Sequence, residues 1–198
     1  MALPALHPSP GNLREVAEEI ERSMGGLHVE ILGGKIVMSP TPRGKHAGTV
    51  RRIRRQLAPG MPDGTDAYEV SSIAMPDDPD DYCTPDLIVL PVEWDEDDEW
   101  LADPADVALA VEVISKSERS KAVDAKNGWY AAAGVRTLLA LDPRGAGSWI
   151  LYTRPKEGRY QGVLHGSYGE DIPLPPPFTR SVDTDCLPRY EETAVREG

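Results

Sequence analysis

The stretch that decides the fold runs from Ala108 to Val135 and reads ALAVEVISKSERSKAVDAKNGWYAAAGV. Its first seven residues are apolar except for Glu112. So short an apolar run, bounded by serine and charge, predicts a strand that is buried on both faces. Burying an ionised carboxylate without compensation costs several kcal/mol, so Glu112 needs a metal ion, a cation or a proton beside it. The alternative is that Glu112 lies at the open end of the strand and caps a loop, and this stretch alone leaves both explanations open.

The residues that follow predict a helix and then a second strand. Ser115 and Ser117 can cap a helix over residues 118–133, and Gly134 can end it in the left-handed conformation. Residues 136–141 are again mostly apolar. A strand, a helix and a strand of this composition predict a right-handed crossover with two parallel strands.

The residues before this unit predict two further helices and several strands. Apolar spacing predicts an amphipathic helix over 13–24, and Gly33-Gly34 predicts a hairpin turn between strands 28–32 and 35–38. In that register Glu30 lies opposite the apolar face, and the simplest interpretation is the solvent-exposed side of the hairpin. The remaining elements that we expect before residue 108 are a helix over 45–57, strand material over 67–75 and a strand over 84–90.

Length and composition favour one globular domain. The chain has 198 residues with 40% hydrophobic content, and we expect one domain over 12–198. A proline-rich segment over 1–11 precedes this domain and is expected to be poorly ordered. Antiparallel strands near 149–152 and 159–164 are expected to close the domain. No apolar run approaches the ~20 residues of a membrane span, and no signal peptide is visible, so we expect a cytoplasmic protein. Cys83 and Cys186 lack zinc-site spacing and are expected to be reduced and structural.

Charge is distributed unevenly along the chain. The net charge of −12 argues against a nucleic-acid ligand, because such ligands are bound by neutralising phosphates. A basic block interrupts this acidity, and two acidic blocks, 77–81 and 93–99, are interpreted as solvated loops. The basic block is either a solvated helix face or a nucleic-acid-binding patch. Its members are Arg43, Lys45, Arg51, Arg52, Arg54 and Arg55.

A second acid stands at the start of a predicted strand. Alone, Asp86 would be interpreted as a turn residue bonded to nearby backbone. The order of elements, however, puts Asp86 and Glu112 on neighbouring strands of one sheet. Two converging carboxylates make a hard, oxygen-rich site suited to Mg²⁺ or Mn²⁺, with the backbone carbonyl of Val113 as a natural third ligand.

Several short motifs follow one another in a characteristic order along the chain. They are the Glu30–Gly34 hairpin, Met38-Ser39-Pro40, His46, Pro85-Asp86, Glu112-Val113-Ile114-Ser115, Lys126 followed by Tyr130, Gly134-Val135 and Leu141-Asp142-Pro143. Over residues 28–187 these motifs together resemble the Uma-type restriction endonucleases, a branch of the PD-(D/E)XK nuclease superfamily.

The resemblance implies an α/β fold with a restriction endonuclease-like αβββαβ core and a central mixed sheet, to which the N-terminal helix and hairpin and the C-terminal antiparallel strands are added. It also implies cleavage of phosphodiester bonds with a divalent metal held by Asp86 and Glu112, and with a lysine that orients or activates the attacking water. The superfamily's usual lysine position is Ile114 here, so the resemblance assigns that role to Lys126. Lys116 is the other candidate, but its place at the exit of the strand favours a solvated loop lysine. It places Glu30 and His46 at the periphery of the site, although as sequence features alone both are interpreted as structural or surface residues.

Two departures from the family pattern keep a second hypothesis open. The leading hypothesis is a Mg²⁺-dependent endonuclease acting on DNA, with the basic block contacting phosphates. Ile114, and Ala122 where the family usually has an aspartate, instead favour a catalytically weak or inactive nuclease-fold module that binds nucleic acid or a protein. The nearest aspartate, Asp124, points to a different face of the predicted helix. A third hypothesis is that the acidic blocks bind a basic partner protein. Many nucleases of the superfamily act as dimers, which allows for a homodimer, but the sequence leaves the oligomeric state open.

Overall fold

The computed structural model describes residues 13–96 and 98–191, and the segment predicted to be poorly ordered, 1–11, lies outside them. The helices are α1 (Leu13–Ser23), α2 (Gly44–Leu57), η1 (Ala58–Gly60), η2 (Val92–Glu96) and α3 (Ser120–Ala133). The strands are β1 (Leu27–Ile31), β2 (Ile36–Pro40), β3 (Thr65–Tyr68), β4 (Ser72–Met75), β5 (Asp78–Cys83), β6 (Leu87–Pro91), β7 (Leu101–Ala102), β8 (Leu109–Val113), β9 (Thr137–Asp142), β10 (Ser148–Lys156) and β11 (Arg159–Ser167).

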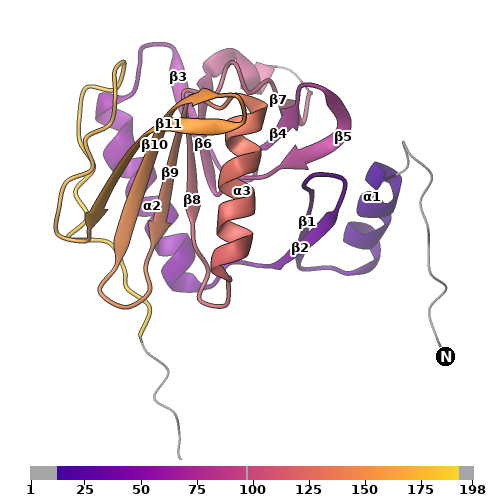
Figure 1. Ribbon diagram of the computed structural model, residues 1–198, viewed down its shortest axis with the longest axis horizontal. Coiled ribbons are helices and arrows are strands. Elements are labelled where there is room, and N and C mark those ends of the chain that lie inside the picture. The colour runs from indigo at the N-terminus through magenta and orange to yellow at the C-terminus, as the bar shows by residue number, and fades with distance from the viewer. Residues whose placement is uncertain (1–12, 97, 192–198) are drawn as a thin grey trace, which may run out of the picture.

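The larger of two sheets forms the centre of the molecule (Figure 1). Its strand order is β11-β10-β9-β8-β6-β3. The pair β8–β9 is parallel, as predicted for the crossover through α3, whereas β6 pairs antiparallel with both β3 and β8. In chain order, α2, β3, β6, β8, α3 and β9 therefore give the αβββαβ core with a mixed sheet that the family resemblance implied.

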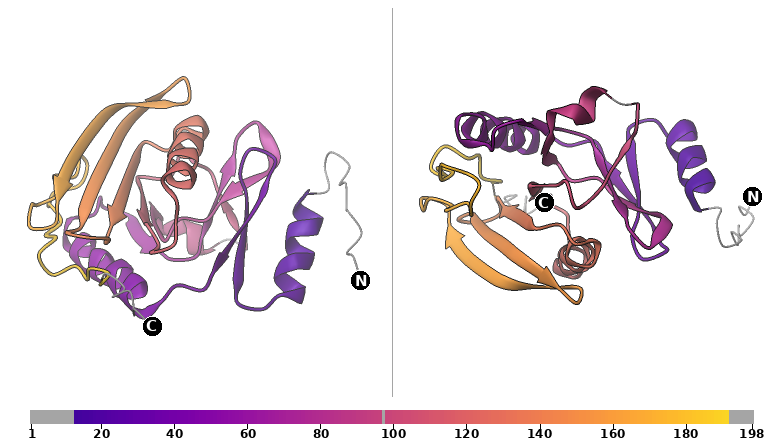
Figure 2. Two further views of the ribbon diagram at one scale, coloured as in Figure 1. Left: turned by 60° about the horizontal axis from the view of Figure 1, so that its bottom comes forward. Right: turned by 90° about the horizontal axis from the view of Figure 1, so that it is seen from above.

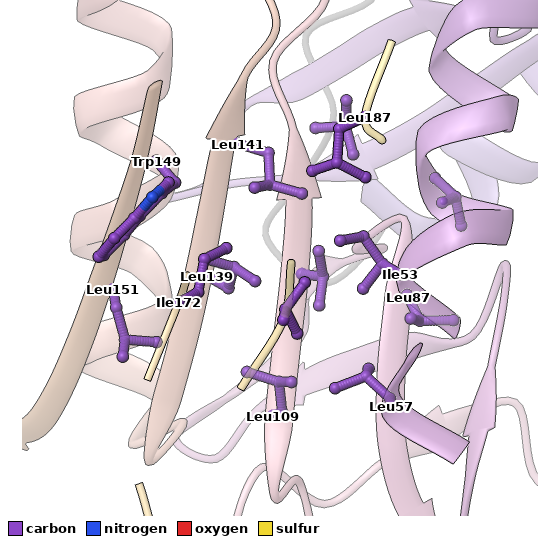
Figure 3. Packing of buried hydrophobic residues seen from close by; sticks show 14 of the residues in the cluster. Ile53, Leu57, Leu87, Leu109, Leu139, Leu141, Trp149, Leu151, Ile172 and Leu187 are labelled. Atoms are coloured by element: carbon purple, nitrogen blue, oxygen red, sulfur yellow. The ribbon is translucent and has the colours of Figure 1, made fainter. Parts of the chain in front are cut away.

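Helices α2 and α3 cover opposite faces of this sheet (Figure 2). Successive strand residues point to opposite faces, so each apolar strand contributes to two cores. Figure 3 shows the core on the α2 side, where Ile53 and Leu57 of α2 pack with Leu87, Leu109 and Leu139 of the sheet. Each such side chain contributes about 1.5–3 kcal/mol when fully buried. The core on the α3 side joins Trp129, Tyr130 and Ala133 to Ile88, Ala110 and Leu138.

The smaller sheet has the order β2-β1-β5-β4-β7 and packs against α1 through a third apolar cluster. Its β1–β2 hairpin has the predicted register, with Val29 opposite Met38 and Ile31 opposite Ile36. Gly33 and Gly34 have φ of 58° and 69°, which is the left-handed turn geometry that the glycine pair predicted.

The strand material predicted over 67–75 is confirmed, and it forms two strands, because the chain turns at Val70, whose φ is 61°, and leaves β3 of the large sheet to enter β4 of the small one. The interpretation of the first acidic block is wrong. The first acidic block is not a solvated loop but strand β5, and Asp81 is buried there. Its carboxylate accepts hydrogen bonds from the backbone N–H groups of Gly33 and Gly34 at 2.7 and 3.1 Å, which compensates its burial.

The predicted serine cap of α3 is also wrong. The helix begins at Ser120, and its N-cap residue, Arg119, makes no side-chain cap hydrogen bond. Glu118 instead accepts a hydrogen bond from the backbone N–H of Ser115 at 3.1 Å. The C-terminus follows the prediction, since Gly134 has φ of 90°. In residues 13–96 and 98–191 no helix is long and apolar enough to cross a membrane.

Candidate active site

Asp86 and Glu112 lie opposite each other on neighbouring strands. Leu87 of β6 pairs with Val111 of β8, so the next pair outward in this antiparallel register is Asp86 with Glu112. Paired residues point to the same face of a sheet, which here is the face covered by α3. The sequence prediction that these two carboxylates occupy adjacent strands is confirmed.

The Asp86 carboxylate is fixed by two hydrogen bonds. The backbone N–H of Val113 donates to Oδ2 at 2.7 Å, and His46 Nε2 lies 2.6 Å from Oδ1. His46 occupies the first turn of α2 and is buried, so the surface interpretation of this residue is wrong. Burial opposes a charge on His46, but its hydrogen bond to Asp86 and the negative charges of Asp86 and Glu112 raise its pKa above the ordinary value.

Glu112 meets two side chains of α3. Lys126 Nζ lies 2.8 Å from Glu112 Oε1, and the Tyr130 hydroxyl donates a hydrogen bond to the same oxygen. Lys126 and Tyr130 are four residues apart and therefore lie on one face of the helix. Helix α3 thus brings a lysine to the glutamate, although the position two residues after Glu112 is Ile114.

Glu30 reaches the same lysine from the small sheet. Its Oε1 lies 3.1 Å from Lys126 Nζ and accepts a hydrogen bond from the backbone N–H of Thr84 at 2.8 Å. The residue is 4% exposed, so its interpretation as the solvent-exposed side of the hairpin is wrong. This side of the hairpin is covered by Lys126 of α3 and by the end of β5, where Cys83 and the backbone of Thr84 contact the Glu30 carboxylate.

Cys83 completes the buried cluster. Its thiol lies 3.3 Å from Glu30 Oε1 and 3.1 Å from the Tyr130 hydroxyl. Burial raises the pKa of this thiol well above its ordinary value, so it is a neutral hydrogen-bonding group at neutral pH. Sequence reasoning interpreted Cys83 as merely structural and had no signal for this contact, which depends on the pairing of β5 with β1.

The comparisons with known proteins identify the family and the fold of the chain. A family model described as "Uma2: Putative restriction endonuclease" matches residues 17–185. The chain belongs to the Uma2 family. No curated protein matches the chain. Its structure is similar to the crystal structure of a protein from Anabaena variabilis described as a putative nuclease, with a TM-score of 0.55 and 18% sequence identity over 74% of this chain and 81% of that chain. At this identity the likeness shows the fold alone, which is the restriction endonuclease-like fold that the sequence predicted.

The electrostatics of this Uma2 site determine which groups are charged. Burial raises the pKa of Glu112 to about 7, with further contributions from the charges of Asp86 and Glu30, while Lys126 lowers it. Burial would lower the pKa of Lys126, but the negative charges of Glu112 and Glu30 and the hydrogen bond to Glu112 raise it well above the ordinary value. Lys126 is therefore a firmly held ammonium that donates hydrogen bonds and does not accept a proton.

The donor atoms fit a hard divalent cation. Each carboxylate oxygen has two lone pairs that can accept a hydrogen bond or bind a metal. Each Asp86 oxygen makes one hydrogen bond, Oδ1 with His46 and Oδ2 with Val113 N–H, so one lone pair on each stays available. The hydrogen bonds to Glu112 go to Oε1, and the charge of Asp86 disfavours ionisation of Glu112. A cation between the two would offset this repulsion. Over the described ranges no group of three or more His, Cys, Asp or Glu side chains is arranged for a metal, so the Val113 carbonyl remains the predicted third ligand.

Other predicted residues lie around this centre. Lys116 does not reach it and donates instead to the backbone carbonyl of Glu191 at 2.6 Å. Asp124 and Ala122 are exposed on α3.

A small pocket of about 10 Å³ lies beside Glu112 and Lys126. This volume is about that of one water molecule.

The residues of the basic block lie along α2, and the first turn of this helix carries His46. Its side chains are exposed or half-buried on the outer surface of the helix. Arg52 donates to the Gly48 carbonyl at 3.1 Å, and Arg54 lies 3.9 Å from Glu69. Among the residues described, Arg43, Arg51 and Arg55 have no carboxylate within ion-pair distance. The block therefore presents positive charge on the helix that leads into the site.

Proposed function

We propose that this Uma2 chain is a divalent-metal-dependent endonuclease that hydrolyses phosphodiester bonds in DNA. The observation that carries the proposal is the arrangement of Asp86 opposite Glu112 on neighbouring strands, with Lys126 of α3 bound to Glu112 beside a small pocket. The family description, restriction endonuclease, supports the same reaction. Perturbed, mutually facing titratable groups of this kind are typical of catalytic sites.

In this proposal Asp86, Glu112 and the Val113 carbonyl would hold Mg²⁺ or Mn²⁺. The bound ion would supply Lewis-acid polarisation of the scissile phosphate. The carboxylate of Asp86 is oriented for this task by Val113 N–H and His46, so that little reorganisation is needed when the site is filled.

Lys126 has the role of a positioned cation. Its ammonium is shared by Glu112 and Glu30, and its raised pKa keeps it protonated. It can therefore orient an attacking water by donating a hydrogen bond and can stabilise negative charge on a phosphate oxygen, but it does not act as the general base. Of the two roles implied for this lysine, orientation is the one that its charge state favours.

DNA is the proposed substrate because of the basic face of α2. Exposed arginines there would contact backbone phosphates and position the duplex without selecting a sequence. The net charge of −12 makes such local positive charge necessary for approach to a polyanion. A cytoplasmic location and a dimer that cuts both strands are consistent with this activity and belong to the proposal.

The test is cleavage of supercoiled plasmid DNA by purified protein with Mg²⁺ or Mn²⁺, compared with EDTA. Wild-type protein should nick or linearise the plasmid, and Asp86→Asn, which keeps the side-chain shape but removes the charge, should not. Asp124→Asn is the matched control, because Asp124 is an exposed acid on α3, and it should cleave like the wild type. Equal cleavage by wild type and Asp86→Asn would indicate a contaminant. DNA binding without cleavage would favour the non-catalytic module.

A further inference from the structure

The last described residues of the chain lie across the rim of the site. The C-terminal segment passes beside α2 (Figure 2), where Asp183 and Gln56 are joined by two hydrogen bonds. Further along, the backbone N–H of Tyr190 donates to the Pro143 carbonyl at 2.8 Å. The Tyr190 hydroxyl lies 3.4 Å from Nδ1 of His46, the residue that holds Asp86.

Two lysines at this rim bind the same residue. Lys45 Nζ lies 2.8 Å from Glu191 Oε1 and donates to the Arg189 carbonyl at 3.0 Å. Lys116 Nζ donates to the Glu191 carbonyl at 2.6 Å. Lys45 directly precedes His46, and Lys116 follows Glu112 by four residues. The two ammonium groups therefore flank the site from the α2 side and from the end of β8.

The groups that these lysines bind have the hydrogen-bonding character of a phosphodiester. A carboxylate and a carbonyl offer oxygen atoms that only accept, as do the two non-bridging oxygens of a backbone phosphate. Lys45 and Lys116 lower the pKa of Glu191, with the hydrogen bond from Lys45 as the largest cause, so the rim favours an anion. Because the Lys45 and Glu191 side chains are 47% and 88% exposed, an incoming anion can replace this contact at little cost.

We propose that Lys45 and Lys116 form a binding site for one backbone phosphate of DNA beside the Asp86–Glu112 centre, and that Glu191 occupies this site in the free protein. The inference rests on the proposed function, because DNA is the ligand that brings a phosphate to this rim. It assigns Lys116 a role that its position at the exit of the strand did not predict. It also makes the end of the described chain a competitor of the substrate.

Competition of this kind has two measurable consequences. Removing either lysine should weaken DNA binding and lower the slope of log K against log salt concentration by about 0.9, the value for one lost phosphate contact. Removing the charge of Glu191 should tighten binding by about two- to five-fold at low salt, the range of an exposed ion pair. Because the gain comes from weakening the contact between the Glu191 carboxylate and Lys45, it should disappear when both lysines are absent.

The experiment is fluorescence anisotropy with a labelled DNA duplex in EDTA, over about 50 to 200 mM salt. We expect Lys116→Ala to lower the slope and Glu191→Gln to tighten binding, with no gain from Glu191→Gln in the Lys45→Ala/Lys116→Ala background. Lys156→Ala is the matched control for the lysines, because its hairpin lies beyond Thr153, at the opposite end of β9 from the site. Glu99→Gln, an exposed acid outside the rim, is the control for net charge.

The outcomes separate this inference from the proposed function. If wild-type protein binds and cleaves DNA but Lys116→Ala retains the full slope, the phosphate site is refuted and the nuclease proposal stands. The same holds if Glu191→Gln gains no more than Glu99→Gln, or keeps its gain without the two lysines, because net charge then explains the effect. If wild-type protein fails to cleave plasmid DNA with Mg²⁺ or Mn²⁺, and neither it nor Glu191→Gln binds the duplex, both proposals fall.

Discussion

Replacing Lys126 by methionine should destabilise the folded protein by about 3–4 kcal/mol at pH 7. Methionine keeps an unbranched apolar stem but removes the ammonium that lies 2.8 Å from Glu112 and 3.1 Å from Glu30. The three side chains are at most 16% exposed, so water can replace little of the lost interaction. Removing one partner of a buried ion pair typically costs 3–5 kcal/mol, because the other charge stays buried.

Protonation sets the upper limit of this cost. A buried carboxylate without a partner can become neutral, and neutralising an ordinary carboxyl group with a pKa of ~4.3 at pH 7 costs about 3.7 kcal/mol. Glu112 already has a pKa of about 7, so most of the free-energy cost of protonating this residue at pH 7 is present in the wild type as well. The new cost falls mainly on Glu30, which loses its ammonium partner. The expected total is therefore close to the cost of neutralising one carboxylate.

The sign of the pH dependence follows from proton binding. In the variant the folded state holds a proton that the unfolded chain releases above pH ~4.3, so folding takes up protons and lower pH favours the folded state. The difference from wild type should therefore shrink as the pH falls from 7 toward 5, by up to about 1.4 kcal/mol per pH unit for each carboxylate affected.

Urea denaturation followed by the fluorescence of the buried Trp129 and Trp149 measures this difference. Lys121→Met is the matched control, because Lys121 is an exposed lysine of the same helix, and it should stay within about 0.5 kcal/mol of wild type. A loss below about 1 kcal/mol for Lys126→Met at pH 7, or a loss that is constant with pH, would refute the assignment of Lys126 as the counter-ion of Glu30 and Glu112.

Three further substitutions test the surroundings of the site by the same denaturation measurement. Tyr130→Phe removes the hydroxyl that donates to Glu112 and should cost about 1.5–3 kcal/mol, whereas a cost near zero would mean that the hydrogen bond is absent in solution. Asp81→Ala leaves the Gly33 and Gly34 N–H groups without their carboxylate and should cost about 1–3 kcal/mol, and an unchanged midpoint would contradict the burial of Asp81. Gly134→Ala places a side chain at φ of 90° and should lower the free energy of unfolding by about 1–2 kcal/mol. The cost comes from the backbone alone, because nothing lies within 4 Å of the added carbon. A stabilised variant would contradict the left-handed end of α3.

The pairing of Asp86 with Glu112 could be predicted from the sequence because it depends on local signals. Two short apolar runs predicted two strands, and consecutive strands commonly lie side by side. An acid inside or beside such a run must then lie on or next to one of these two neighbouring strands. The strand, helix and strand from residue 108 to 141 likewise predicted the parallel pair β8–β9. These signals predicted the core and the positions of the two carboxylates. The role of Lys126 was predicted from the family resemblance.

The contacts of Glu30 could not be predicted, because they depend on a second sheet that the sequence concealed. An acidic block is usually a solvated loop, but here Asp81 satisfies the N–H groups of a hairpin turn, so the block can form β5 and pair with β1. This pairing brings Cys83, at the end of β5, to the Glu30 carboxylate, which Lys126 of α3 also contacts. Charge content alone does not distinguish an exposed acid from one that accepts buried backbone hydrogen bonds.

The rim formed by residues 189–191 was equally hidden. Its contacts join the C-terminal segment to Lys45 and Lys116, which are 146 and 75 residues from Glu191 along the chain. No periodicity links positions so far apart. Short exposed hydrogen bonds of this kind are weak and leave no composition signal, so they become visible only when the backbone is placed.

The most direct test of the central claim is a crystal structure with Mn²⁺, in which anomalous scattering locates the metal. We predict one Mn²⁺ bound by the carboxylates of Asp86 and Glu112, with Lys126 still within hydrogen-bond distance of Glu112, and no Mn²⁺ at this position in Asp86→Asn. A wild-type crystal in which Mn²⁺ is absent from these two carboxylates, or binds only elsewhere, would contradict the assignment of this site as the metal centre of a nuclease.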